Sequence, residues 1–396
     1  MLVEELQLSI NKRLVKILHF PTSYPDPDRG KPYDCIFVKE HILSVAPYCE
    51  NRVVYISSDQ PSGNKIVEIV TSDEDSIPTD RIYFKTIRPL WITNVYVRIV
   101  LFLYFLRLIL IKRFYPDILH VHFHQAGLMA MLFCKVFRIK VVVTEHWSAF
   151  IGWPALPKPR FVKAAKVFEY AKWVFTVSHR IKEGIEKYTG VNLIKKTSVT
   201  LNSVDTKIFF LSSTEIKSEH YEKKILCVAR LAEEKDLPIL FSALSKLEKL
   251  NENFVCEVIG KGDISQFKTQ LTDLNISSKV IFLGEQSKSF ISTKMREADA
   301  LVISSFIENS PCVIGEAFCT GLPVVSTHVG GIPELLDDTN GILVPPKDPE
   351  QLALALHEAL YVRKFNREAI SQRAQAHFSY QAIGAQLFKV YQKVLA

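Results

Sequence analysis

The sequence predicts an α/β protein with two Rossmann-like, doubly wound parallel-sheet domains that face each other across a cleft. Three observations favour this fold class. The length of 396 residues suits two domains of about 100 to 200 residues each. Short β-branched runs alternate with segments of helical periodicity along most of the chain, as in parallel strands joined by crossover helices. A polar stretch at 202–218 divides this alternation into two series.

The first series begins at residue 15. Apolar, β-branched runs predict strands at 15–20, 53–57, 118–121, 140–144 and 174–178. Segments with apolar residues three and four positions apart predict helices near 37–47, 95–113, 125–137, 160–172 and 179–188.

The second series follows the polar stretch. Its expected strands lie at 225–228, 254–259, 280–283, 300–304, 324–326 and 341–344, and its expected helices lie near 237–250, 264–274, 290–297, 312–320 and 349–361. We place the domains at 1–205 and 206–377. Residues 378–396 are expected to form a helix that packs back on the first domain.

Cysteine usage and the N-terminus indicate an intracellular protein. The seven cysteines are an odd number and include no C-x-x-C pair, so we expect reduced, mostly buried thiols and neither a disulfide framework nor a zinc ribbon. Residues 1–14 carry two early glutamates and no long apolar core, which is the wrong order for a signal peptide. We expect a cytoplasmic location, with the inner face of the cell membrane as an alternative.

Positive charge is concentrated in residues 81–200, which hold 20 Lys and Arg against 5 Asp and Glu. Such a region can face nucleic acid, an anionic membrane or a phosphate-bearing substrate, or it can be an ordinary solvated surface. No nucleic-acid motif supports the first option. Residues 95–111 are the most apolar stretch, but Arg98 and Arg107 interrupt it. A buried domain helix whose arginines reach the surface and a helix lying on a membrane both remain open.

The densest motif follows the strand expected at 300–304. Glu308 lies in the loop after this strand, Ser310 is expected to be the N-cap of the next helix, and Pro311 its first residue. Gly321 suits the left-handed end of that helix.

Two carboxylates therefore lie beside a helix N-terminus, because Glu316 falls in the second turn. Free N–H groups and the positive end of the helix dipole suit a phosphate or a sugar oxygen, and carboxylates suit vicinal hydroxyls. The combination with Glu308 predicts a nucleotide-sugar pocket. The alternative is that both glutamates are ordinary surface residues.

Two cations, Arg230 and Lys235, lie in the loop after the first strand of the second domain and can converge on one diphosphate. They would neutralise a leaving nucleotide without necessarily needing a metal; the alternative is a solvated loop. Gly260 and Gly262 follow the next strand without the third glycine of a dinucleotide fingerprint or a clear acidic ribose partner about 20 residues on, so we expect no nicotinamide site. A tight turn near a nucleotide and a plain turn both remain open.

His120, His122 and His124 alternate along a strand end, which places them on one side and suggests a metal site. We expect no carboxylate or cysteine nearby to complete a ligand set, and we therefore assign no metal.

These motifs resemble the retaining glycosyltransferases of family 4, which have the two-domain GT-B fold. The resemblance covers nearly the whole chain. It rests on the E-x7-E pair, the R-L-x-x-x-K loop, G-x-G, F-L-G at 282–284, A-x-x-x-G-x-P-V-V from Ala317, G-G-x-P-E at 330–334 and the terminal F-S-Y from Phe378. The loop at 21–30 and residues 36–40 look like those of bacterial surface-polysaccharide members.

The resemblance implies roles for individual residues. Glu308 would contact the donor sugar, Glu316 the ribose, and Arg230 and Lys235 the diphosphate, while His146, after the strand at 140–144, would lie near the reacting sugar. The implied catalytic set is Glu308, His146, Arg230 and Lys235. The implied donor-binding set is Arg230, Lys235, Glu308, Glu316, Gly260, Gly262, Asn309, Ser310 and Pro311, with no metal and no cofactor besides the nucleotide diphosphate sugar.

The expected function is therefore that of a retaining, hexosyltransferase-type glycosyltransferase in surface polysaccharide biosynthesis. It would move a sugar from a nucleotide diphosphate sugar onto a saccharide acceptor, which we expect to be lipid-linked. The first domain would serve the acceptor side, contact an anionic membrane peripherally and bind no nucleic acid. The alternatives are a nucleotide-sugar epimerase or phosphorylase on the same fold, and a catalytically silent subunit that binds a partner transferase.

Overall fold

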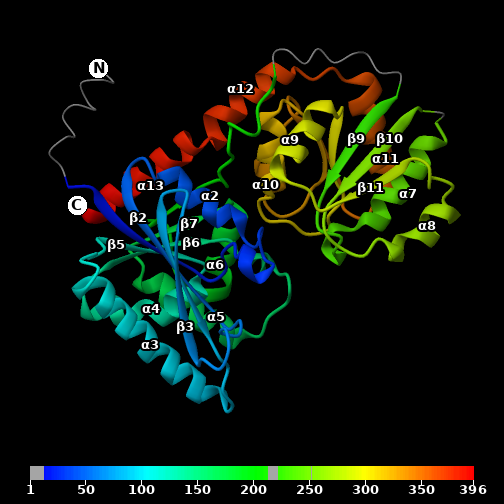
Figure 1. Cartoon of the computed structure of the whole chain (residues 1–396). Helices are drawn as coiled ribbons and strands as arrows, with labels where there is room; N and C mark the ends of the chain where they lie inside the picture. Colours follow the sequence, from blue (N-terminus) through cyan, green and yellow to red (C-terminus); the bar gives the residue numbers. More distant parts are fainter. Residues whose placement is uncertain (1–12, 213–221, 251) are drawn as a thin grey trace, which may run out of the picture.

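The computed structural model describes residues 13–212, 222–250 and 252–396. Residues 1–12, on which most of the expectation about a signal peptide depends, and part of the polar stretch after residue 212 lie outside the described residues. Two α/β units, each built on one sheet, stand beside each other (Figure 1). The predicted fold class is confirmed.

The first sheet has eight strands in the order β3-β4-β2-β1-β5-β6-β7-β8, and all neighbours are parallel except β3 with β4. The strands are β1 (Val15–Pro21), β2 (Cys49–Ser57), β3 (Val67–Glu74), β4 (Ile77–Phe84), β5 (Ile118–His122), β6 (Lys140–Glu145), β7 (Trp173–Thr176) and β8 (Thr197–Val199). The helices are α2 (Ile36–Val45), α3 (Leu90–Leu110), α4 (His124–Val136), α5 (Lys158–Tyr170) and α6 (His179–Thr189), with short turns η1 (Pro27–Arg29) and η2 (Ser148–Ile151).

The hairpin of β3 and β4 is absent from the sequence-based prediction. β3 has no fully buried residue, so it lacks the apolar run by which the other strands were predicted. β4 buries two charged residues, Asp80 and Arg81, each of which forms ion pairs. Charges inside a strand mask its apolar pattern, because pattern-based prediction reads them as solvent-exposed.

The second sheet has six parallel strands in the order β11-β10-β9-β12-β13-β14. The strands are β9 (Lys223–Val228), β10 (Phe254–Ile259), β11 (Val280–Gly284), β12 (Ala300–Ile303), β13 (Val324–Thr327) and β14 (Gly341–Val344). The helices are α7 (Leu237–Glu248), α8 (Lys268–Asp273), α9 (Lys288–Glu297), α10 (Cys312–Cys319), α11 (Pro349–His357), α12 (Arg367–Phe378) and α13 (Tyr380–Leu395), with shorter turns η3 (Glu233–Lys235), η4 (Ser265–Phe267), η5 (Ile332–Glu334) and the π-turn η6 (Glu358–Val362). Strand order reverses between β9 and β12, and ligands of such sheets bind at the carboxyl ends beside this reversal.

The last helix, α13, returns from the second unit to the first (Figure 1). Its Tyr391 is fully buried against the first sheet and its hydroxyl lies 2.6 Å from Nδ1 of His120. Lys140 of β6 also holds this helix: its Nζ donates to the carbonyl oxygens of Val394 and Leu395 at 2.7 and 2.9 Å. The first core is thus completed by the end of the chain.

Helix α3 is half inside the protein. One face, which includes Val97, Leu101 and Phe105, is buried in the first core. The opposite face exposes apolar side chains, namely Leu90, Trp91, Val95, Ile99, Leu103 and Leu110. By length and composition, α3 is the one helix in the described part of the chain that could cross a membrane, and 33% of its apolar window is buried in the protein. Arg98 and Arg107 are exposed on it.

Candidate active site

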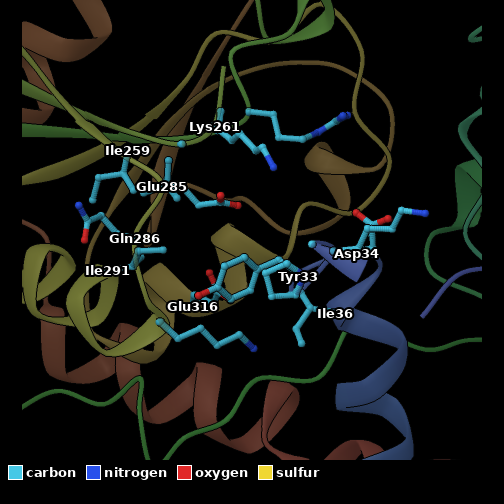
Figure 2. A pocket seen from close by; sticks show the side chains of 17 residues that line it. Tyr33, Asp34, Ile36, Ile259, Lys261, Glu285, Gln286, Ile291 and Glu316 are labelled. Atoms are coloured by element: carbon cyan, nitrogen blue, oxygen red, sulfur yellow. The ribbon is translucent and has the colours of Figure 1, made fainter. Parts of the chain in front are cut away.

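A cavity of about 310 Å³ opens between the two units at the carboxyl ends of the strands (Figure 2). The second unit contributes the loops after β9, β10 and β11 together with Glu316 of α10. The first unit contributes the segment at 30–36, from which Tyr33 points into the cavity. The volume falls at the lower end of the range for small-molecule sites, which run from about 300 to 1,000 Å³.

Two glycines lie in the loop after β10, beside this cavity. Gly260 and Gly262 have φ of +153° and +152°, and a Cβ on Gly260 would lie 1.8 Å from the carbonyl oxygen of Ala229. The backbones after β9 and β10 therefore pack directly on each other, which only glycine permits. Gly260 lines the cavity, whereas Gly262 packs against Leu231 and is outside its lining.

Lys235 and Glu308 form an ion pair, with 2.5 Å between Nζ and Oε1. Ser305 also donates to this Oε1 from 3.0 Å. Arg230 is separate: its guanidinium is 74% exposed and pairs with Glu234 at 3.0 Å. The sequence led us to expect that the two cations converge, but in the structure each contacts a different carboxylate.

Glu316 projects into the cavity from the second turn of α10 (Figure 2). Burial raises its pKa to about 7, and Lys288 opposes that shift. Lys288 is itself paired with Glu40 of α2, so a cation and two carboxylates from both units meet beside the cavity.

Sequence reasoning missed Glu40 and Lys288, which are 248 positions apart. The segment at 36–40 was singled out only for its likeness to other proteins.

The helix start differs from the prediction. α10 begins at Cys312, Pro311 is its N-cap with extended backbone (φ −67°, ψ 124°), and no side chain caps it. Ser310 is not the N-cap: it lies one residue before Pro311, and its carbonyl accepts a hydrogen bond from Nδ2 of Asn202 at 2.8 Å. The backbone at Ser310 is thus held by a residue from the segment that connects the two units.

The loop at 308–310 also holds the two units together. Asn309 accepts from Oγ of Ser178 at 2.9 Å and donates to the carbonyl of His146 at 3.1 Å. Next to it, a Cβ on Gly331 would lie 2.3 Å from the carbonyl oxygen of Asn309, so this glycine is needed for the close approach. Glu334 accepts from the backbone N–H groups of His179 and Arg180 at 2.7 and 3.0 Å, at the N-terminus of α6.

His146 lies at the carboxyl end of β6, as predicted from its position after that strand, but its ring is turned inward. The side chain packs against Phe37 and Phe123, with ring centroids 4.7 and 5.2 Å away, and the residue is 8% exposed. Burial holds the pKa of His146 well below its ordinary value. Its carbonyl, and not its ring, faces Asn309.

The three alternating histidines do not share one side. Phe123 adopts φ +65° and turns the chain, so His124 begins α4 and its Nδ1 lies 2.8 Å from Oε2 of Glu145. A carboxylate therefore does lie beside one of these histidines, but among the described residues it forms a pair with His124 and completes no metal-ligand group. His120 and His122 do stack, at 4.3 Å between centroids.

Comparisons with known proteins show which family the chain resembles. Residues 51–208 match the family model described as Glycosyltransferase Family 4, and residues 212–377 match Glycosyl transferases group 1. The chain is 29% identical over 259 residues to the amylovoran biosynthesis glycosyltransferase AmsK of Erwinia amylovora, covering 62% of this chain and 61% of the relative. It is 26% identical over 282 residues to the putative teichuronic acid biosynthesis glycosyltransferase TuaC of Bacillus subtilis, covering 69% and 67%.

The chain thus spans about three fifths to two thirds of the length of these relatives. Among solved structures, Anabaena HepE in complex with UDP superposes with a TM-score of 0.73 at 18% identity, over 96% of this chain and 100% of that one. At that identity the superposition shows a shared fold.

Proposed function

The chain belongs to the glycosyltransferases that join a family 4 domain to a group 1 domain, and from that membership we propose that it transfers a sugar from a nucleotide diphosphate donor to a saccharide acceptor in polysaccharide biosynthesis. The observation that carries the proposal is the interdomain cavity, which Glu316 lines and beside which the Lys235–Glu308 ion pair lies. Carboxylates can accept hydrogen bonds from sugar hydroxyls, and cations can hold phosphates; both kinds of side chain lie beside this cavity.

The nucleoside would occupy the cavity of about 310 Å³, with its ribose hydroxyls on Glu316. Arg230, which is exposed and pairs with Glu234 of the turn η3, would swing onto the diphosphate. Lys235 would exchange part of its contact with Glu308 for a phosphate oxygen. Glu308 would then accept from a hydroxyl of the donor sugar.

We assign a retaining course to the reaction. The bond between the anomeric carbon and the phosphate oxygen breaks, and the acceptor oxygen bonds to the same face of that carbon. The charge that develops on the leaving diphosphate is neutralised by Arg230 and Lys235, which stabilises the transition state more than the bound donor. The acceptor proton passes to the departing phosphate oxygen, since the ring of His146 is turned into the protein.

The acceptor is proposed to be lipid-linked, and the protein to act at the cytoplasmic face of a membrane. The support is α3, whose exposed face combines apolar residues such as Trp91 and Leu103 with Arg98 and Arg107. A helix with an apolar face rimmed by cations suits the interface of an anionic bilayer.

A thermal-shift panel of UDP-, GDP- and ADP-sugars tests the donor class, because a ligand that binds only the folded state raises the melting temperature by mass action. We expect one base to stabilise the protein clearly. Release of free nucleotide only when acceptor is present would distinguish a transferase from an epimerase. Stabilisation by none of the three would favour a silent subunit and contradict the proposal.

A further inference from the structure

The segment that leads into α2 forms the first domain's wall of the interdomain cavity. Its residues that line the cavity are Gly30, Lys31, Pro32, Tyr33, Asp34 and Ile36. Tyr33 is 44% exposed, and its ring points into the cavity (Figure 2). The transfer reaction as described above assigns donor contacts only to residues of the second domain, so it gives this wall no part.

Hydrogen bonds hold the start of this segment in one conformation. The backbone N–H of Asp26 donates to the carbonyl of Lys31 at 2.8 Å, and the N–H of Lys31 donates back at 2.9 Å. The hydroxyl of Tyr83 on β4 donates to Oδ2 of Asp26 at 2.7 Å. Arg81, also on β4, donates from Nη2 to the carbonyl of Pro25 at 2.7 Å. The β3–β4 hairpin, which sequence patterns did not reveal, therefore supports the segment that enters the cavity.

The other end of the segment is held by the start of α2. Cys35, the N-cap of this helix, has a left-handed backbone (φ +48°, ψ 41°), which is uncommon for a residue other than glycine. The backbone N–H of Ile36 donates to the carbonyl of Tyr33 at 3.3 Å, so a turn joins Tyr33 to the helix. Tyr33 thus lies between two held points of the chain.

The side chain of Tyr33 is unpaired within the part of the chain that the structure describes. No described residue hydrogen-bonds to its hydroxyl, and no described aromatic ring or cation lies against its ring. An aromatic ring that is exposed in a cavity and has no such partner can offer its face to a flat ligand.

The second domain contributes an apolar wall to the same cavity. Val228 and Ile259, at the ends of β9 and β10, and Ile291 of α9 line the cavity and belong to one apolar cluster. Figure 2 shows Ile259 and Ile291 across the cavity from Tyr33. A space between an aromatic ring and an aliphatic surface suits a planar heteroaromatic ring, which stacks on the first and packs on the second.

We propose that Tyr33 stacks on the nucleobase of the donor. This inference rests on the proposed function, in which the ribose hydroxyls bind Glu316, a residue that lines the same cavity. The base is bonded directly to the ribose, so a ribose on Glu316 brings the base into the cavity as well. The acceptor-side domain then takes part in donor recognition, and one bound nucleotide contacts both domains.

Titration calorimetry of the full-length chain with UDP, GDP and ADP tests the inference. For the nucleotide that binds the wild type most tightly, Tyr33→Ala should raise Kd roughly 5- to 100-fold, as expected when a ring stacked on a base is removed. Tyr33→Phe keeps the ring and should bind nearly as the wild type does. Tyr188→Ala alters an exposed tyrosine of α6 outside the cavity lining and is the matched control, so its Kd should be unchanged.

A spectroscopic signature separates stacking from a structural role. Tyr33→Trp keeps a stacking face and adds an indole whose fluorescence a stacked base quenches. The same nucleotide should therefore quench the emission of this variant more than that of the wild type. Pyrophosphate has no ring and should cause no such additional quenching.

Three results would overturn the inference and leave the proposed function intact. They are an unchanged Kd in Tyr33→Ala, a Kd in Tyr33→Phe as high as in Tyr33→Ala, and a Tyr33→Trp variant that binds the nucleotide without additional quenching. The second would mean that the hydroxyl, and not the ring, contacts the donor. A wild-type protein that binds none of the three nucleotides would instead contradict both the inference and the proposed function.

Discussion

The hydroxyl of Tyr380 donates a 2.7 Å hydrogen bond to Oε2 of Glu40, although the two residues are 340 positions apart. The other oxygen of Glu40 pairs with Lys288, and Lys288 lies in the electrostatic field of Glu316. The first helix after β1, the second domain and the C-terminal helix therefore meet at one carboxylate beside the cavity. Because Glu40 raises the pKa of Glu316, this contact between domains also adjusts the charge of the predicted ribose-binding residue.

Glu316 should make the stability of the free protein depend on pH. Burial raises its pKa from 4.5 to about 7, so the folded state holds its proton more tightly than the unfolded state. The stabilisation is complete below pH 4.5 and is lost as the pH rises through about 7. In Glu316→Gln, which cannot titrate, we expect a flatter dependence; chemical denaturation from pH 5 to pH 8 measures the difference. Parallel profiles for the two proteins would contradict the shifted pKa.

Glu40→Gln should lower the pKa of Glu316, because it removes a negative charge and leaves Lys288 to Glu316 alone. If ionised Glu316 accepts from the ribose, nucleotide affinity rises with pH, and the midpoint of that rise should move to lower pH in this variant. Calorimetric titration across the pH range gives the midpoint. Tyr380→Phe removes the neighbouring hydrogen bond without changing any charge, and its midpoint should stay in place.

Lys235→Ala should weaken nucleoside diphosphate binding by roughly 10- to 100-fold, since hydrogen bonds to charged groups contribute about 1.5–3 kcal/mol. Arg230→Ala should act in the same direction. Calorimetry with the cognate nucleotide measures both affinities. Lys249, exposed just after α7 at the end away from the cleft, provides the control, and its alanine variant should bind like the wild type. The diphosphate assignment fails if both cleft variants keep full affinity.

Glu308→Gln and Glu316→Gln should differ in steady-state kinetics. A contact to the donor sugar can strengthen in the transition state, so loss of the Glu308 carboxylate should lower kcat more than it raises KM. A ribose contact stabilises donor and transition state equally, so the change at Glu316 should appear mainly in KM. The division of roles would be refuted by identical kinetic profiles.

Helix α3 should attach the protein to anionic vesicles. Each basic residue near such a surface contributes about 1 kcal/mol, and salt screens the attraction within roughly 8 to 10 Å. We expect flotation with anionic vesicles at low salt, release at high salt and little binding to neutral vesicles. Trp91→Glu with Leu103→Glu should abolish flotation, whereas Leu354→Glu, at an exposed apolar position of α11 in the other domain, should not. A wild-type protein that ignores anionic vesicles at low salt contradicts the membrane proposal alone.

The sequence alone was enough to predict the features that depend on neighbouring residues in the chain. Alternating strands and helices predicted the second sheet and most of the first, without the hairpin of β3 and β4, and Gly321, predicted to be left-handed, has φ +72°. The sequence alone did not predict contacts between side chains that come from distant segments of the chain. Nothing local in Ser310 reveals that Asn202 will bind its carbonyl, and nothing local in His41 reveals that its ring will meet those of His122 and His146.

The return of α13 to the first sheet has a consequence for how the molecule is made. Tyr391 packs on one side of the first sheet 271 positions after the histidine it contacts, in a small apolar cluster with Ile17, Val142 and Phe175. That side of the first domain can reach its final packing only after residues 206–377 have been synthesised, whereas the larger core of the domain comes entirely from residues 18–193. Severing the chain at the joint would yield an N-terminal fragment with an exposed apolar groove, whereas the middle segment would keep its own core.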